Sequence, residues 1–391
     1  MNGNRWASRR VKNMPASMFN TMDAAKCQAS ARGLEIIDLS LGSSDLPAPQ
    51  TAVQVLSQAL DEPETHGYCM HSGTRSLREA AAAWFARRYG GILDPNRHIQ
   101  VLIGSQEGFA HLLLGVTDPG DTVLLPDPSY PSYFGAVALA GLDQVTVPLL
   151  ERNSFLPDLT SIPPEVARRA RVMVISYPNN PTSAVASREF LQQVIDFCRA
   201  YDILLVHDFP YVDMVYGDYE APSVLALPGG VETAIELYSC SKSYHMGGFR
   251  VGWAAGNPDA IEALAHVKSA IDFNPYLGIQ RAAAAALDLP RTETRRTARI
   301  FEERRDVLVE ALNSAGWRTR LPQASMYVWT RLPGGLTDSY DFAINLVLNT
   351  GVCLAPGRAF GERGEGFVRI ALVREPEALQ RAVRHIQEYL D

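Results

Sequence analysis

The pattern of apolar positions predicts alternating strands and helices through the middle of the chain. Short, nearly continuous apolar runs recur there, and such runs are typical of strands covered on both faces. A helical pattern at Arg188–Tyr201 places its apolar residues on one side. The predicted strands lie at 100–103, 122–125, 144–147, 171–175, 203–206, 236–238 and 251–255. This alternation indicates an α/β fold.

The last third of the chain has a different pattern. A long, highly charged helical segment at 291–315 precedes a strand at 367–373 and a closing helix at 376–390. These elements predict a smaller α+β domain. We therefore expect three parts, which are an N-terminal arm with part of the small domain (1–40), a large domain (41–285) and a small C-terminal domain (286–391).

Composition and charge narrow the function. The chain has 391 residues and a net charge of -7, which gives no reason to expect a nucleic-acid partner. No apolar run reaches the roughly 18 residues of a membrane span, and the basic start lacks the apolar core of a secretory signal. The five cysteines include no C-x-x-C pair. We expect a cytoplasmic protein without disulfides, a metal site or a membrane partner.

Lysine is scarce in this sequence. Only four of the 36 basic residues are lysines, namely Lys12, Lys26, Lys242 and Lys268. Lys242 follows a predicted strand within a run of small and hydroxylated residues. A solvated loop lysine would be the ordinary explanation, but polar residues also follow the neighbouring strands.

Ligands of open parallel sheets bind beyond the carboxyl ends of the strands. Taken singly, each polar residue there has an ordinary explanation, such as an N-cap serine or a proline-rich turn. Together they resemble a ligand site. The residues that follow the successive strands are Ser105 and Gln106, Tyr130, Asn180, Asp208 and Tyr211, and Lys242, with Arg250 before the last strand.

Pyridoxal 5′-phosphate (PLP) can use every member of this set. Its aldehyde requires a lysine amine, and an aspartate keeps its ring nitrogen protonated. Its phosphate requires N–H groups, hydroxyls and an arginine, and its ring can stack on an aromatic side chain. No metal or nucleotide uses all of these groups. We therefore predict PLP as the cofactor.

Four motifs carry a resemblance that extends over nearly the whole chain. They are SCSKSYHMGGFRVG at 239–252, YPNNPT at 177–182, DFPY at 208–211 and VRIALV at 368–373. In these the chain resembles the class I and II aminotransferases of PLP fold type I, closest to the branch with LL-diaminopimelate and aspartate-type enzymes. The resemblance implies a large domain with a mostly parallel seven-stranded sheet between helices, plus a smaller α+β domain.

The resemblance also implies a role for each matching residue. Lys242 corresponds to the Schiff-base lysine and proton shuttle, and Asp208 to the partner of the ring nitrogen. Arg369, Gly42 and Asn180 would bind the substrate, with Arg369 on its α-carboxylate. The other cofactor contacts would come from Ser105, Gln106, Tyr130, Asn180, Tyr211, Ser239, Ser241 and Arg250, and from Tyr68 of the partner subunit in a homodimer.

The implied reaction moves an amino group from an L-amino acid to a 2-oxo acid such as 2-oxoglutarate, in amino-acid biosynthesis. Three departures from the family pattern leave the substrate open, namely Ser183 for a glycine, Phe209 for an acidic residue and Gln106 for a lysine common in diaminopimelate enzymes. Phe19 and Tyr133 are candidates for contacting the substrate side chain.

Two alternatives remain at this point. A C–S lyase or a decarboxylase could use the same fold and the same cofactor residues, because these reactions begin in the same way. A non-catalytic binding or regulatory protein could also keep the fold. The complete set of Lys242, Asp208, Arg250 and Arg369 argues against that second alternative.

Overall fold

A computed structural model describes residues 5–14, 18–70 and 72–391. In this part of the chain, one sheet contains the seven predicted strands, which are β2 (Ile99–Leu102), β3 (Thr122–Asp127), β4 (Asp143–Pro148), β5 (Ala170–Ile175), β6 (Leu204–Asp208), β7 (Ala234–Ser239) and β8 (Gly252–Gly256). Their order is β2-β8-β7-β6-β5-β3-β4. Only β8 runs antiparallel to its neighbours. The expected α/β fold with a mostly parallel sheet is confirmed.

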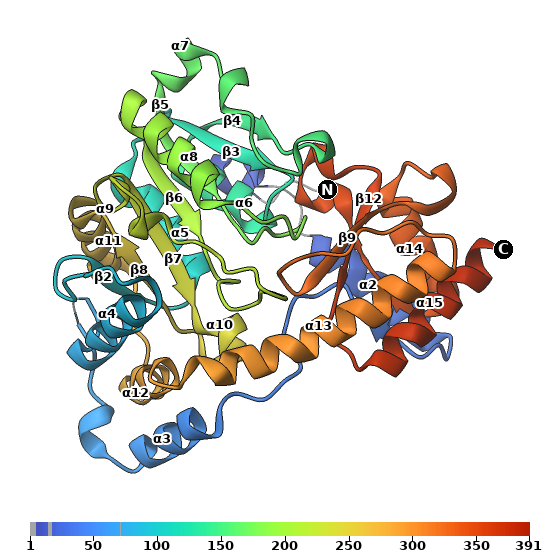
Figure 1. The fold of residues 1–391 in the computed structure, drawn as a ribbon, viewed down its shortest axis with the longest axis horizontal. Coiled ribbons are helices and arrows are strands. Elements are labelled where there is room, and N and C mark those ends of the chain that lie inside the picture. Colours follow the sequence, from blue (N-terminus) through green and yellow to red (C-terminus); the bar gives the residue numbers. More distant parts are fainter. Residues whose placement is uncertain (1–4, 15–17, 71) are drawn as a thin grey trace.

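Helices cover both faces of this sheet (Figure 1). One face carries α4 (Arg75–Tyr89), α8 (Arg188–Tyr201) and α12 (Leu277–Leu287). The other carries α5 (Ser105–Val116), α6 (Pro131–Ala140) and α11 (Pro258–Ile271). Along β5, Val172 and Val174 pack toward one layer while Met173 and Ile175 pack toward the other. Burial on both faces explains why the strands are continuous apolar runs.

The helix α8 shows how local sequence sets an element. The side chain of Ser187 accepts a hydrogen bond from the amide of Phe190, which caps the first turn. The buried stripe consists of Leu191, Val194, Ile195 and Cys198. Asp202 then adopts a left-handed conformation with φ 57° and ends the helix. The observed bounds are those predicted from the sequence.

A second group of elements surrounds a smaller sheet. In the described chain, β9 (Tyr327–Arg331), β11 (Ala355–Pro356) and β12 (Phe367–Ala371) form an antiparallel sheet, and β1 (Ile37–Asp38) pairs with β10 (Val352–Cys353). The helices packed here are α2 (Met18–Ala31), α13 (Arg291–Ser314), α14 (Ser339–Thr350) and α15 (Pro376–Leu390). Figure 1 shows α13 running from α12 to this sheet. The domain boundaries stay a prediction.

The remaining helices are short or peripheral. They are α1 (Arg9–Asn13), α3 (Gln50–Leu60), α7 (Pro164–Ala167), α9 (Gly230–Thr233) and α10 (Cys240–Ser243). The helix α3 packs on α12. Among the residues that the structure describes, no helix combines the length and the apolar character that crossing a membrane requires. The five cysteines are all unpaired.

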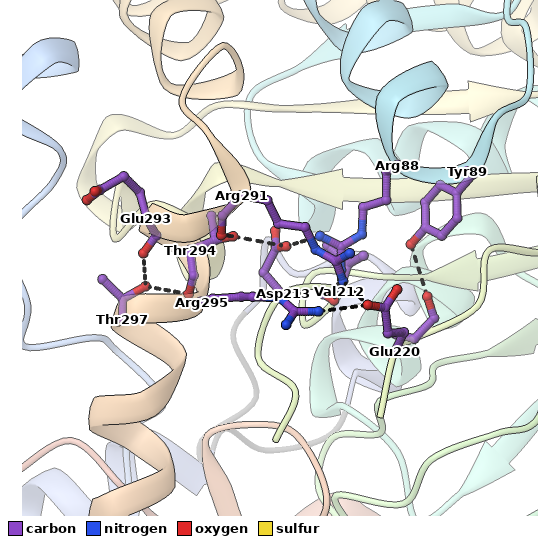
Figure 2. Close-up of polar contacts among 11 residues, drawn as sticks. Arg88, Tyr89, Val212, Asp213, Glu220, Arg291, Glu293, Thr294, Arg295 and Thr297 are labelled. Carbon is purple, nitrogen blue, oxygen red and sulfur yellow. Dashed lines mark hydrogen bonds and ion pairs between the residues drawn. The ribbon is translucent and has the colours of Figure 1, made fainter. Parts of the chain in front are cut away.

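A buried ion pair fastens the loop after β6 to two helices (Figure 2). Arg88 of α4 binds Asp213, and their side chains are only 6% and 4% exposed. Arg88 also donates to the carbonyl of Val212 at 3.0 Å, and Thr294 of α13 donates to Asp213 at 3.4 Å. The loop that carries Tyr211 is therefore tied to both α4 and α13.

Removal of one partner should destabilise the protein strongly. We expect Arg88→Met to lower the free energy of unfolding by about 3–5 kcal/mol, because Asp213 would remain as an uncompensated buried charge. Denaturant unfolding measures the loss. The double variant Arg88→Met/Asp213→Leu should recover most of it. A loss below about 1 kcal/mol in the single variant would show that this pair behaves like an exposed one.

Candidate active site

The ends of the central strands converge on a cavity of about 310 Å³. The parallel strands β3, β5, β6 and β7 are neighbours in the sheet, so the loops that follow them meet at one edge. Every residue to which the resemblance gave a role, except Tyr68, lines this cavity. The structure thus brings together Gly42, Ser105, Gln106, Tyr130, Asn180, Asp208, Tyr211, Ser239, Ser241, Lys242, Arg250 and Arg369. Their individual roles stay predictions.

Lys242 lies in the short helix α10, directly after β7. Its amine donates a hydrogen bond to the carbonyl oxygen of Gly42. Burial lowers the pKa of Lys242 below its usual value, and the positive charges of Arg369 and Arg250 lower it further. The opposing effects of Tyr327 and Asp208 do not reverse this direction. A larger fraction of neutral, nucleophilic amine is therefore present than for an exposed lysine.

Asp208 is the last residue of β6 and has one unsatisfied oxygen. Its Oδ2 accepts a hydrogen bond from the Tyr133 hydroxyl, whereas Oδ1 is buried and has no partner among the described residues. Burial raises the pKa of Asp208 to about 6, although the Tyr133 hydrogen bond and the charges of His207 and Lys242 oppose the rise. An unpaired carboxylate oxygen in a buried site is costly, so this site is suited to a cationic N–H donor.

One end of the cavity has the features of an anion site. Ser105 and Gln106 begin α5, whose first turn has free N–H groups. Arg250 lies beside this turn in a left-handed conformation with φ 52°. Gly104, just before this turn, has a φ of 85°, a backbone conformation that favours glycine. Together with the hydroxyls of Ser239 and Ser241, these groups fit a phosphate.

The other end of the cavity contains a buried arginine from the smaller sheet. Arg369 of β12 is 2% exposed and donates to Asn180 Oδ1 at 2.8 Å and to the Ser40 carbonyl at 2.6 Å. Its guanidinium lies over the Tyr327 ring, 4.1 Å from the centroid. Its Nε has no hydrogen-bond partner among the described residues. A guanidinium held in this way can bind a carboxylate through two hydrogen bonds.

One tyrosine of the cavity, Tyr327, had no assigned role in the sequence-based site. Tyr327 is hydrogen-bonded to Tyr211 at 2.8 Å. Burial raises the pKa of Tyr211 well above its usual value. Burial also opposes ionisation of Tyr327, but the charges of Arg369 and Lys242 outweigh it and lower the pKa of Tyr327. Either hydroxyl of this pair can be the donor, so the Tyr211 hydroxyl can still donate to a ligand in the cavity.

Tyr133 was expected as a contact to a substrate side chain, but its hydroxyl binds Asp208. It does not line the cavity. Its only sequence signal is its place three residues after Tyr130, which is the N-cap of α6. Tyr327 has no comparable signal, since it comes from a distant strand. The side chain of Phe19 lies outside the described residues.

Two further predicted residues lie differently from the rest. The Tyr130 hydroxyl donates to Gln106 Oε1 at 3.0 Å, which places this aromatic side chain at the anion end. Tyr68 is 87% exposed and lies outside the cavity, with its ring 5.9 Å from that of Phe273. Its predicted role in the site of a partner subunit is compatible with this exposure.

Two other lysines, Lys26 and Lys268, form ion pairs with carboxylates that do not line the cavity. Lys26 binds Asp23 at 2.6 Å and Asp38 at 2.8 Å. Lys268 is 1% exposed and binds Glu107 at 2.5 Å and Asp272 at 3.0 Å. Lys242 is therefore the lysine whose amine is directed into the cavity.

These groups fit PLP. Asp208 has a free oxygen for a protonated ring nitrogen, Lys242 has a buried amine of lowered pKa, and the start of α5 with Arg250 fits a phosphate. The seven-stranded sheet and this site define a PLP-dependent enzyme of fold type I. Residues 35–386 match the family model described as "Aminotransferase class I and II". The chain belongs to this family and is a PLP-dependent aminotransferase.

Similar proteins agree with this assignment. The chain is 43% identical over 383 residues to the LL-diaminopimelate aminotransferase of Moorella thermoacetica, covering 98% of both chains. It is 48% identical to a probable N-succinyldiaminopimelate aminotransferase from Thermus thermophilus, with a TM-score of 0.91 over 95% of this chain and 100% of the other. A mutant aspartate aminotransferase of Thermus thermophilus gives a TM-score of 0.91 at 28% identity, covering 98% and 99% of the two chains.

Tyr133 should set the pH range of cofactor binding. The Tyr133 hydrogen bond lowers the pKa of Asp208, so Tyr133→Phe should raise that pKa above its present value of about 6. Protonated Asp208 cannot pair with a cationic ring. The pH below which PLP affinity declines should therefore move upward by about one unit.

Titration of the cofactor-free protein with PLP over a pH series measures this shift. Tyr89→Phe is the matched control, because Tyr89 is a half-buried tyrosine whose hydroxyl donates to the Ala221 carbonyl (Figure 2). An acid limb that stays in place in Tyr133→Phe would contradict the electrostatic role of Tyr133.

Proposed function

We propose that this aminotransferase moves the amino group of a diaminopimelate-type L-amino acid to 2-oxoglutarate. The observation that carries the proposal is the shared cavity of the Lys242 amine, the free Asp208 oxygen and the Arg369 guanidinium. The names of the similar proteins support the substrate class, because they include LL-diaminopimelate and N-succinyldiaminopimelate aminotransferases. Family membership favours transfer over the lyase, decarboxylase and non-catalytic alternatives.

We assign the cofactor contacts as follows. Asp208 Oδ1 would hold the protonated ring nitrogen, and Tyr130 would stack on the ring. Asn180 and Tyr211 would bind the phenolate oxygen, and the phosphate would be bound by Ser105, Gln106, Ser239, Ser241 and Arg250. When bound, PLP supplies the electron sink that makes the amino acid's α-proton acidic.

The remaining steps belong to side chains on the other side of the cavity. Arg369 binds the substrate α-carboxylate, and the backbone of Gly42 contacts the same group. Lys242 Nζ, as a neutral amine, takes the proton from the amino acid's α-carbon and acts as the proton shuttle. Its hydrogen bond to the Gly42 carbonyl orients the amine, because one N–H is then fixed toward the backbone of Gly42.

Spectroscopy of the purified protein with PLP tests the proposal. A visible absorption band should form, disappear on addition of LL-diaminopimelate and return on addition of 2-oxoglutarate. N-succinyl-LL-diaminopimelate and L-aspartate serve as comparison donors that differ in the distal end. Pyruvate and ammonia among the products would instead indicate a lyase, and an unchanged band with every donor would refute the proposal.

Lys242→Ala should abolish turnover without unfolding the protein. The expected loss is at least about 10³-fold in kcat, because both the attachment point of PLP and the base are removed. Steady-state assays with LL-diaminopimelate and 2-oxoglutarate measure this loss, and circular dichroism checks the fold. Retention of full activity in Lys242→Ala would disprove the assignment of this lysine.

We also propose a homodimer with shared active sites. Among the described residues that line the cavity, the cations are Lys242, Arg250 and Arg369, and each already has an assigned partner. No cation remains there for the distal carboxylate of 2-oxoglutarate, so a second subunit is a natural source of the missing contact. The exposed Tyr68 is the candidate for contacting the partner's cofactor. We further place the protein in the cytoplasm, where its unpaired cysteines would stay reduced.

Subunit complementation provides the test of shared sites. Lys242→Ala and Tyr68→Ala should each have low activity alone. A mixture that is unfolded and refolded together should recover about a quarter of the parent activity, because half of the dimers are hybrids with one intact site. Mixed assays of kcat measure the recovery. Activity equal to the mean of the two variants would argue that each site is complete within one chain.

A further inference from the structure

Residues 40–46, which we call the strap, connect the smaller sheet to the larger one. The strap begins after β1, which pairs with β10, and leads to α3, which packs on α12. Residues 41–44 line the cavity. The Ser40 carbonyl accepts a hydrogen bond from Arg369 at 2.6 Å, and the Gly42 carbonyl accepts one from Lys242. The position of the strap therefore determines what these two cations contact.

Backbone hydrogen bonds do not hold the strap. Leu39, just before it, is bonded to the backbones of Cys353 and Ala371 at 2.9 and 2.8 Å. From Ser40 to Ala48, the chain makes no backbone–backbone hydrogen bond to any described residue. A segment without such bonds has many accessible conformations unless side chains fix it. The strap consequently depends on the side chains that bind it.

The strap is bound by the side chains of Lys242, Arg369, His245 and Arg304. The first two of these side chains are required for the reaction itself. Lys242 and Arg369 hold the strap only until cofactor and substrate compete for them. The other two have no such competing role. His245 Nδ1 is bonded to Ser44 Oγ at 2.8 Å, and burial lowers the pKa of His245 to about 4, so the ring is neutral near pH 7. Arg304 binds the next residue of the strap, Asp45.

The Arg304–Asp45 contact has a specific geometry. Arg304 Nη1 and Nη2 donate to Asp45 Oδ1 and Oδ2 at 2.7 and 2.8 Å, which is a bidentate pair that sets direction as well as distance. Arg304 is 1% exposed and also donates to Glu375 at 2.7 Å and to the Leu372 carbonyl at 3.2 Å. A buried guanidinium with this many acceptors is held rigidly in place.

The location of the pair gives it a wider role. Arg304 belongs to α13, which also passes from the larger sheet to the smaller one (Figure 1). The pair therefore ties the two connections between the sheets to each other, next to the cavity. If the two sheets moved relative to each other, the Arg304–Asp45 contact would move the strap with them. Weakening this contact would also change the position of the strap.

We propose that Arg304 and Asp45 are positioning residues for transamination, whose ion pair holds the strap in the conformation that binds the amino acid. This inference rests on the proposed function. Neither residue lines the cavity. Without the pair, the strap would be in its binding-competent conformation for only part of the time, and the apparent dissociation constant of the substrate would rise by the inverse of that fraction.

Two variants of the same arginine's partners separate positioning from folding. Asp45→Asn removes the carboxylate on the strap, whereas Glu375→Gln removes a carboxylate that Arg304 binds away from the strap. The PLP-loaded variants are mixed with L-glutamate, and the loss of the visible band gives an apparent dissociation constant and a limiting rate. We expect Asp45→Asn to raise the constant about tenfold, with little change in PLP affinity, and Glu375→Gln to match the parent.

Equal effects of the two substitutions, or a parent-like constant in Asp45→Asn, would overturn the positioning role and leave Arg304 with a folding role only. If Asp45→Asn does not fold, Asp45→Glu decides, because it keeps the charge but displaces the bidentate contact. A raised constant in that variant supports the proposal, and a parent-like one overturns it. A parent protein whose band does not respond to L-glutamate would refute the proposed function, and the inference with it.

Discussion

The site depends on a buried carboxylate, one of whose two oxygens has no hydrogen-bond partner among the described residues. Asp208 is buried at the end of a central strand, and Tyr133 satisfies only one of its oxygens. Burial raises its pKa and lowers that of Lys242, so both groups are pushed toward neutrality. A cofactor with a cationic ring and an aldehyde compensates both at once. The protein therefore bears an electrostatic cost that binding of PLP relieves.

The site is assembled from two sheets that fold around separate cores. Asp208 and Lys242 come from the larger sheet, whereas Arg369 and Tyr327 come from the smaller one. The proposed carboxylate-binding group is thus placed by different packing from the proposed cofactor-binding groups. Contacts that cross between the sheets, such as that of Arg369 with Asn180, hold the two parts of the site in a fixed relative position. This division lets substrate recognition change while the cofactor end is preserved.

Much of the fold was predictable because burial is visible in the sequence. Strands covered on both faces are apolar throughout, and α8 and α15 have clear stripes, so their positions were predicted well. The helices α6, α11 and α12 were not predicted, because runs such as RAAAAAL in α12 have little polar contrast to reveal their periodicity. The cavity residues that follow strands were brought together as expected. The positions of Tyr327 and Arg304 were not predicted, because only tertiary packing brings these residues to the cavity or close to it.

The scarcity of lysine has a chemical consequence. An aldehyde reacts with any accessible neutral amine, so every surface lysine is a competing site for the cofactor. In this protein Lys26 and Lys268 are engaged by carboxylates. Although burial of Lys26 opposes its charged form, the hydrogen bonds to Asp23 and Asp38 raise the pKa of its amine. Lys12 is exposed. Arginine supplies the remaining positive surface charge and does not react in this way. The scarcity of surface lysines therefore favours selective attachment of PLP at the proposed position, Lys242.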